Sequence, residues 1–337
     1  MLRRLLAAAF LILLSLVLLV FAWPQLLGLE RAFVIAQAVS LRGAAVAASV
    51  VVIVLLGFVV ALSPAARRFA ASMAVLIVVF SLVNLAVLST RGFGSLGFET
   101  PGDSTVTVLS WNTLGDAPGS EAIAKLALDS DAEIVSLPET TRETATEVAR
   151  IMDAAGRPMQ VWTIAFDEIS KARSTSLLVS TALGEYQLDD SRGNSRVLPT
   201  VIVTPVDGTG PTIMGVHLVA PISNEMENWR SDLDWIASAC SGDNVIMAGD
   251  FNSTIDHFAG LGNEGDAALG ECRDAADESG NAAVGTWPTA LPALLASPID
   301  HVMQTPNWRV AGMRVIESVD KAGSDHRPVL AELMPAA

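Results

Sequence analysis

The stretch 249–252, Gly-Asp-Phe-Asn, places a carboxylate and an amide two residues apart after a short apolar run. The run, 245–248, is typical of a buried strand, and Gly249 breaks its pattern. In extended backbone, Asp250 and Asn252 point to the same side. Such a pair suits the activation of water beside a phosphate. Taken alone, it is equally typical of an Asx turn at a strand end.

Polar residues also stand at the ends of several other expected strands. They are Asn112, Glu139, His217, Asp300, Asp325 and His326. Each has an ordinary structural alternative, because asparagine forms turns, glutamate stabilises helix N-termini and buried histidine is usually satisfied within the core. The set in chain order is therefore more informative than any one member.

In that order the residues resemble the endonuclease/exonuclease/phosphatase family, which includes deoxyribonuclease I, abasic-site endonucleases, neutral sphingomyelinases and inositol polyphosphate 5-phosphatases. The resemblance covers about residues 105–335 and is carried by Gly-Asp-Phe-Asn at 249–252 and Ser-Asp-His-Arg-Pro at 324–328. It implies an α/β fold, a four-layer sandwich of two mixed β-sheets flanked by helices. The active site is then expected at the strand ends between the sheets.

The resemblance implies a metal site. Glu139 matches the family's metal-binding glutamate, Asn112 matches the asparagine beside it, and Asp325 matches an aspartate near the metal. Hard cations such as Mg²⁺ take oxygen ligands and keep several waters, so one or two carboxylates suffice. We expect Mg²⁺ as the cofactor, with Mn²⁺ as the alternative.

The resemblance also implies the catalytic residues. Asp250 matches the aspartate that orients or deprotonates the attacking water, and Asn252 matches the amide that contacts the phosphate. His326 matches the histidine at the scissile phosphate, and Asp300 matches its aspartate partner. His217 matches a second histidine of the deoxyribonuclease I and phosphatase branches, where abasic endonucleases carry asparagine.

Other residues near these motifs receive simpler interpretations. We expect His301 to pack in the core, His257 to be incidental in a loop, and Arg196 to be a solvated surface residue, with phosphate contact as its alternative. Cys240 and Cys272 can form a disulfide in an oxidising compartment or remain thiols, and the sequence leaves both open.

Apolar residues are concentrated before residue 92 and predict three membrane-spanning helices, since each run approaches the ~20 residues needed to cross a bilayer. The predicted organisation is a transmembrane domain 1–92 with spans at about 5–22, 43–62 and 69–90, a linker 93–104 and a catalytic domain 105–335. The first run can alternatively be a cleaved signal peptide. Residues 32–41 can extend the second span or lie at the interface.

Basic residues set the expected orientation. Arg3-Arg4 and Arg67-Arg68 should be cytoplasmic, which places the catalytic domain outside a cell membrane. The loop 23–42 carries Arg31 and Arg42 against one glutamate, so the bias is modest.

The catalytic region shows alternating strand and helix patterns. Strands are expected at 106–111, 134–137, 160–165, 175–180, 197–205, 211–219, 244–249, 299–304, 308–317 and 328–333, and helices at 120–130, 140–155 and 223–239. Ser120 is a candidate N-cap of the first helix, and Thr140 or Thr141 of the second. Residues 254–285 are expected to form loops and short helices.

Net charge and membrane anchoring reduce the number of candidate substrate classes. Of 21 basic and 36 acidic residues, residues 101–337 hold 14 and 34, a formal net charge of −20. Such a domain repels a nucleic-acid backbone, so duplex nucleic acid is a disfavoured partner. The expected partners are the lipid bilayer and, as substrate, a phosphorylated lipid such as a polyprenyl pyrophosphate, or another phosphate ester. Membrane-anchored bacterial members of the family are similar in layout. The alternatives are an extracellular tethered nuclease and a non-catalytic membrane sensor.

Overall fold

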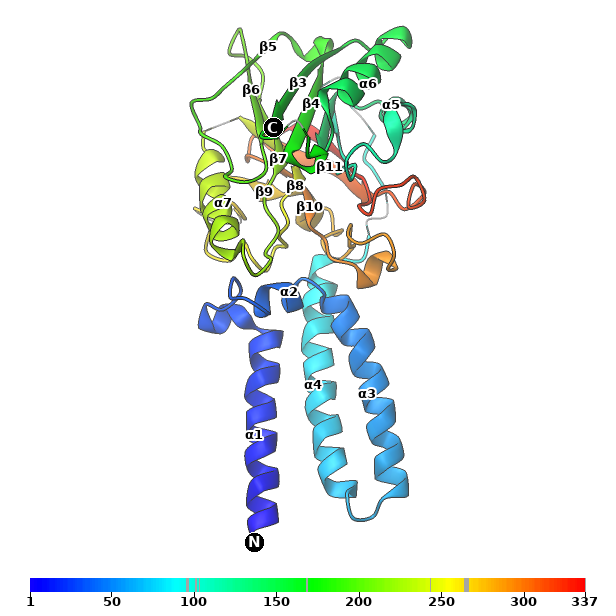
Figure 1. Ribbon diagram of the computed structural model, residues 1–337, viewed down its shortest axis with the longest axis vertical. Helices are drawn as coiled ribbons and strands as arrows, with labels where there is room; N and C mark the ends of the chain where they lie inside the picture. The colour runs from blue at the N-terminus through cyan, green and yellow to red at the C-terminus, as the bar shows by residue number, and fades with distance from the viewer. Residues whose placement is uncertain are drawn as a thin grey trace.

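Three long helices carry a larger α/β region at one end of the molecule (Figure 1). The computed structural model describes residues 1–337 apart from 95, 96, 101, 103, 168, 243, 264–266 and 337. The N-terminus and the turn between α3 and α4 lie at the far end of the helices from the α/β region. The arginine pairs Arg3-Arg4 and Arg67-Arg68 therefore lie at the same end, as their predicted common side requires.

The N-terminal region consists of α1 (Leu2–Ala22), the 3-10 turn η1 (Pro24–Leu27), α2 (Ile35–Val39), α3 (Arg42–Leu62) and α4 (Arg67–Arg91). Helices α1, α3 and α4 are long and apolar enough to cross a membrane, with mean hydropathy of 3.1, 3.0 and 2.5 in their most apolar windows. The segment 32–41 does not extend α3. It forms the separate short helix α2, which lies between the long helices and the α/β region.

Two six-stranded sheets form the α/β region. The first has the order β11-β12-β1-β2-β4-β3, with bounds Trp308–Val315, Val329–Pro335, Val106–Ser110, Ile134–Pro138, Ser174–Ser180 and Met159–Ala165. The second has the order β5-β6-β7-β8-β10-β9, with bounds Tyr186–Leu188, Val201–Pro205, Thr212–His217, Val245–Asp250, Asp300–Gln304 and Arg273–Asp274. Among the described strands, β1 pairs with β2 and β7 with β8 in parallel while the other neighbours are antiparallel, so both sheets are mixed.

Helices cover the outer faces of the two sheets. Helices α5 (Gly119–Asp129) and α6 (Arg142–Ala154) share an apolar cluster with the first sheet. Helix α7 (Met226–Ala239) does the same on the second sheet, and a third cluster joins the two sheets face to face. This is the four-layer sandwich that the resemblance implies, in which amphipathic helices bury their apolar faces against sheets.

Most expected elements are present, with small shifts at their ends. Thr141 caps α6, where its hydroxyl oxygen accepts the Thr144 N–H, but Ser120 lies inside α5 and is not its N-cap. The one-turn helix α8 (Ala275–Glu278) lies in the stretch 254–285, where short helices are expected. The sequence does not predict β5 and β9, because strands of two or three residues carry too little periodicity. The short 3-10 turns are η2 (Lys171–Arg173), η3 (Thr181–Leu183) and η4 (Ala293–Leu295).

The structure describes the state of the two cysteines and part of the predicted linker. Cys240 and Cys272 form a disulfide that joins the end of α7 to the segment before β9. Part of the predicted linker 93–104 lies outside the described residues, but Glu99 N–H donates to Ala311 O at 2.8 Å, so the chain follows β11 there.

Candidate active site

The register of the second sheet places three of the predicted residues in one row. Asp250, the last residue of β8, is the partner of His217 on one side and of Asp300 on the other. The first sheet contributes from the facing edge, because Asn112 and Glu139 follow its parallel strands β1 and β2. Carboxyl ends of parallel strands meet at one edge, and the two sheets bring both edges together.

Gly249 lets β8 approach β7 closely enough to aim Asp250 into this space. A Cβ at residue 249 would lie 1.9 Å from the backbone oxygen of Val216, so no other residue type fits without moving a strand. Phe251 is fully buried and packs edge-on against the rings of Phe258 and His301. The motif therefore alternates residues that fix the backbone with residues that carry polar groups into the site.

Two site residues adopt left-handed backbone, at φ 57° for Glu139 and φ 46° for Asn252. Non-glycine residues seldom take this conformation, and it is enriched at functional sites where surrounding structure enforces it. At Asn252 the enforcing contacts are an N–H bond to Asp250 Oδ1 at 2.8 Å and a bond from the Trp229 indole to the Asn252 carbonyl at 3.1 Å.

Two amides hold the Asp250 carboxylate in place. Asn112 Nδ2 donates to Asp250 Oδ2 at 3.0 Å and to Glu139 Oε1 at 3.2 Å. Asn252 Nδ2 donates to Asp250 Oδ2 at 3.2 Å and to the Leu218 carbonyl at 2.9 Å. Both amides thus use their hydrogens inside the protein, so here they orient Asp250, and the contact of Asn252 with phosphate stays a prediction.

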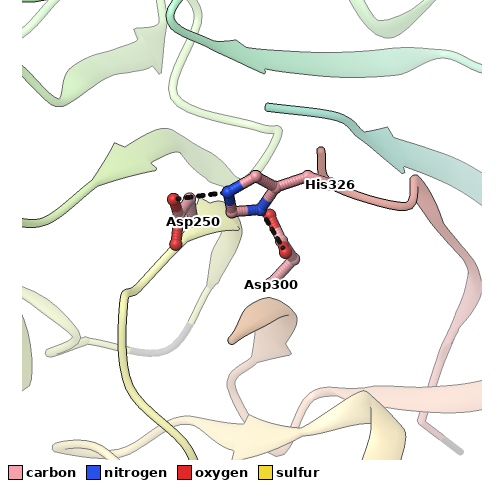
Figure 2. A group of neighbouring side chains, drawn as sticks. All are labelled: Asp250, Asp300 and His326. Atoms are coloured by element: carbon pink, nitrogen blue, oxygen red, sulfur yellow. Dashed lines mark hydrogen bonds and ion pairs between the residues drawn. The ribbon is translucent and has the colours of Figure 1, made fainter. Parts of the chain in front are cut away.

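His326 lies between two carboxylates (Figure 2). Its Nδ1 is 2.9 Å from Asp300 Oδ2, and its Nε2 is 3.8 Å from Asp250 Oδ2. The Trp111 indole donates to the His326 carbonyl at 3.0 Å, which fixes the backbone of this loop against β1. The imidazole of His326, from the segment before β12 of the first sheet, thus lies between two carboxylates of neighbouring strands in the second sheet.

The surroundings raise the pKa values of both His326 and Asp250. Burial would lower the pKa of His326, but the charges of Asp300 and Asp250 outweigh it and hold that pKa above its usual range. Burial and the charge of Asp300 raise the pKa of Asp250, against the opposing effect of His326. His326 is therefore the charged donor of the site, and Asp250 is a better base than an exposed aspartate.

His217 has the opposite character. Burial, and then repulsion by His326, lower the pKa of His217 to about 3, so the ring is neutral at pH 7. Its Nε2 lies 4.0 Å from both Glu139 Oε1 and Asp250 Oδ2, and its Nδ1 is buried without a hydrogen-bond partner. A buried ring nitrogen left unpaired is unfavourable, and it is typical of a site that awaits a ligand.

In the segment 324–327, Ser324 and Arg327 hold the surrounding backbone, whereas Asp325 and His326 point polar groups into the site. Ser324 Oγ donates to the Asn112 carbonyl at 2.6 Å and accepts the His326 N–H at 3.0 Å. Arg327 is buried and binds Asp320 and the carbonyls of 288, 289 and 291, so it holds the neighbouring loop rather than a substrate.

Glu139 and Asp325 fit the expected divalent cation. Burial, with repulsion from Asp325 and Asp300, raises the pKa of Glu139 despite the bond from Asn112 and the charge of His326. Asp325 accepts the Trp287 indole N–H on Oδ2 at 2.8 Å, while its buried Oδ1 has no partner. Asp250, Asp300 and His326 also lie close enough to share an ion, but His326 Nδ1 is already bonded to Asp300. The unpaired Oδ1 of Asp325 fits an ion held together with Glu139, and the Oδ1 of Asp300 is also without a partner.

All predicted site residues but Asn112 and Asp300 line one cavity of about 580 Å³. Its remaining wall is mostly apolar: Leu41, Leu114, Leu198, Val219, Ile222 and Ile299. Gln37, Ser40 and Leu41 come from the end of α2 and the turn into α3. The N-terminal region thus forms part of the wall of the active-site cavity.

The structural roles predicted for His301 and Arg196 agree with the structure, whereas the one predicted for His257 does not. His301 is buried, packs against Phe251 and bonds Asp274 and the Ser253 carbonyl, as a core histidine should. Arg196 is an exposed residue outside the cavity wall, as expected. His257 is not incidental, because it is fully buried and its Nε2 lies 3.0 Å from the Ala36 carbonyl of α2. Nothing local in the sequence signals that contact.

Two packed mixed sheets bring carboxylates, amides and histidines together at their facing strand ends, a set of groups suited to the hydrolysis of phosphate esters. The sequence profile of the Endonuclease/Exonuclease/phosphatase family matches residues 109–326, and the chain belongs to that family. Its enzymes depend on divalent metal ions, in agreement with the acidic and histidine residues gathered at this site.

Solved structures agree on the fold. An endonuclease/exonuclease/phosphatase from Beutenbergia cavernae is 18% identical and has a TM-score of 0.52, covering 69% of this chain and 72% of its own. A humanized D. rerio TDP2 is 17% identical with a TM-score of 0.51, covering 68% and 99%. A family protein from Bacteroides vulgatus is 16% identical with a TM-score of 0.50, covering 69% and 100%. No curated protein matches the sequence.

Proposed function

We propose that this chain is a membrane-anchored, Mg²⁺-dependent phosphoesterase that hydrolyses a lipid-borne phosphate ester or pyrophosphate at the outer face of a cell membrane. A polyprenyl pyrophosphate is the first candidate substrate. The observation that carries the proposal is the shared cavity, in which Asp250 and His326 face residues 37–41 of the segment that joins α1 to α3. A substrate with its phosphate at the headgroup level of a bilayer would reach this cavity without leaving the membrane.

The apolar character of the surroundings supports a lipid. Beside the apolar cavity wall, large apolar side chains are exposed in the segments that join the N-terminal helices and in η4 of the catalytic region. They include Trp23, Leu26, Leu27, Phe33, Val34 and Leu294. Exposed apolar residues next to membrane-spanning helices are typical of the interfacial zone, where tryptophan is enriched.

The residues at the site suffice for in-line hydrolysis. Asp250, held by Asn112 and Asn252, takes the proton of the attacking water. His326, charged because of Asp300, donates to the phosphate, and neutral His217 donates as well. When Mg²⁺ is bound by Glu139 and Asp325, it supplies the positive charge that neutralises the phosphate oxygens.

A tethered nuclease is the alternative, and the charge of the cavity argues against it. Among the described residues that line the cavity, none is lysine or arginine. Proteins that bind duplex nucleic acid do so largely through such contacts with its phosphates. A small phosphate headgroup needs only the cation and the two histidines.

The test uses the full-length protein reconstituted in lipid vesicles. We expect phosphate release from a polyprenyl pyrophosphate, loss of that activity in EDTA, and its recovery with Mg²⁺ and to a lesser degree with Mn²⁺. Supercoiled plasmid should stay intact under the same conditions. Nicking of the plasmid without phosphate release would support the nuclease instead, and full activity in EDTA would refute the metal dependence.

The predicted orientation has its own test. A reporter fused after residue 336 should be active only outside the cytoplasm, since the catalytic region lies at the opposite end of the helices from Arg3-Arg4 and Arg67-Arg68. A cytoplasmic reporter signal would reverse the assignment.

A further inference from the structure

Asp256 is a buried carboxylate that lies six residues beyond Asp250 and outside the active-site cavity. Its side chain is 2% exposed. Arg42 donates to both of its oxygens, from Nη2 at 2.7 Å and Nε at 2.9 Å, and Arg91 Nη1 donates at 2.8 Å. Gln25 Nε2 adds a fourth bond at 2.8 Å. These donors come from the start of α3, the end of α4 and the 3-10 turn that follows α1.

Arg42 joins the three long helices to one another as well. Its Nη1 donates to the Ala22 carbonyl at the end of α1 at 3.0 Å and to Asn84 Oδ1 of α4 at 2.6 Å. The Nε, Nη1 and Nη2 atoms of this guanidinium all donate hydrogen bonds, and the side chain is 4% exposed. A planar, bidentate cation of this kind fixes orientation as well as distance, which a lysine ammonium does not.

Contacts on both sides of Asp256 reinforce the junction. Arg31 donates to the carbonyls of His257 and Ala259 at 2.9 and 3.1 Å. His257 Nδ1 accepts the Thr254 N–H at 2.9 Å, so its Nε2–H donates to the Ala36 carbonyl. Ala36 is fully buried in the apolar cluster that also contains Trp229 and Phe251. The loop 253–259 and the segment 22–42 thus form a single packed unit.

The packed unit of loop 253–259 and segment 22–42 contacts both the Gly-Asp-Phe-Asn motif at 249–252 and the wall of the active-site cavity. Trp229 Nε1 bonds Ser253 Oγ at 2.9 Å and the Asn252 carbonyl, at the start of the loop that carries Asp256. On the other side, Gln37 bonds the Pro221 carbonyl, and both residues line the cavity. A change at Asp256 would therefore move the cavity wall while leaving the residues that react with phosphate on their own strands.

We propose that Asp256 is a positioning residue that latches the catalytic domain onto the helices through Arg42 and Arg91, so that the cavity opens toward the membrane surface. The latch makes the enzyme favour phosphate esters in the bilayer over those in water, an inference that rests on the proposed function. It acts through orientation, since none of these three side chains lines the cavity.

The experiment compares Asp256→Asn with wild type in full-length form in vesicles of phosphatidylcholine and phosphatidylglycerol. One substrate is a polyprenyl pyrophosphate in the same vesicles, and the other is water-soluble bis(p-nitrophenyl) phosphate. We expect kcat/KM for the lipid to fall at least about tenfold, mainly through KM, and kcat/KM for the soluble ester to change less than about twofold. The matched control is Asp129→Asn, an exposed carboxylate on α5 that should change neither.

Hydrogen exchange on the same samples provides a readout that does not depend on the substrate. Segments 31–42 and 253–259 should exchange faster in Asp256→Asn, while β1 and β8 stay protected. An equal loss on both substrates, no loss on either, or unchanged exchange in both segments would overturn the latch. If Asp256→Asn does not fold, Gln25→Ala removes one donor without removing a charge and should show the same pattern in weaker form.

Failure of the proposed function looks different. A wild-type protein that cleaves the soluble ester but no lipid phosphate would refute the lipid substrate, and the exchange result would still decide whether Asp256 holds the two regions together.

Discussion

Two buried charge clusters lie on either side of the loop 250–256, and they are built in opposite ways. At the active site, the carboxylates of Asp250, Asp300, Glu139 and Asp325 act on a single charged imidazole, His326. At the junction with the helices, the single carboxylate of Asp256 faces two guanidiniums. The first cluster has excess negative charge, whereas the second has its carboxylate fully paired.

The pKa values show what this difference means. Burial would raise the pKa of Asp256, but the bonds from Arg42 and Arg91 outweigh it and hold that pKa well below its usual range. The pKa of Asp250 is instead raised by burial and by its acidic neighbour. A paired carboxylate gives structure, and an uncompensated group of carboxylates keeps a place for a cation and a base. Charge balance therefore separates a structural cluster from a functional one within six residues of chain.

The substitution Asp250→Asn tests most strongly whether the active-site cluster is functional and the Asp256 cluster structural. The rate of hydrolysis should fall about 10³-fold, because general-base catalysis contributes on that order. The melting temperature in EDTA should stay level or rise, since the substitution removes a carboxylate from a cluster with excess negative charge. Initial rates on bis(p-nitrophenyl) phosphate and thermal unfolding in detergent measure the two effects. Asp256→Asn should show the reverse, with a lower melting temperature and little change in that rate. If both variants lose stability alike, the distinction between the clusters is wrong.

The sequence predicts the first cluster far better than the second. Strands β1, β2 and β8 are apolar runs that lead into Asn112, Glu139 and Asp250, and β10 begins at Asp300. This local pattern marks the positions, and the family resemblance groups them into one site. The register then brings them together without further information.

The second cluster has no local signature. Asp256 and Arg42 are 214 residues apart, and Asp256 is one of 36 acidic residues in the chain. Arg31 and Arg42 resemble ordinary loop charges in the count for membrane orientation, yet both are used in contacts with the catalytic region. The positive charges of the loop 23–42 are therefore used in docking contacts with the catalytic region. The prediction that His257 is incidental is wrong for the same reason, because its hydrogen-bond partner Ala36 belongs to a helix far away in sequence.

A glycine pair tests how closely the helices dock. A Cβ on Gly43, at the start of α3, would lie 1.9 Å from the Leu294 carbonyl oxygen of η4, whereas a Cβ on Gly57 in the same helix meets nothing within 4 Å. Gly43→Ala should destabilise the junction by about 1–3 kcal/mol, the usual range for overpacking. Gly57→Ala should be neutral or stabilising, because alanine favours helix. Thermal unfolding of both variants in the same detergent measures the difference. Equal melting temperatures would show that α3 does not dock against η4 in solution.

The smallest expected effect concerns pH at the junction. Burial lowers the pKa of the His257 ring to about 4, despite the charge of Asp256 and the bond to Ala36. An unfolded histidine titrates near 6.5, so below that pH the unfolded chain binds the extra proton and the native junction does not. Stability should therefore be fully present above about pH 6.5 and decline toward pH 4, by about 1–2 kcal/mol between pH 7 and 5.

His257→Gln isolates this contribution from the carboxylates that titrate in the same range. The variant should be less stable than wild type at pH 7, because the bonds to Thr254 and Ala36 are weakened, but its melting temperature should fall less between pH 7 and 5. Parallel melting curves for the two proteins across that range would show that His257 does not stay neutral in the folded state. The active-site cluster would then be the one of the two whose behaviour depends on protonation.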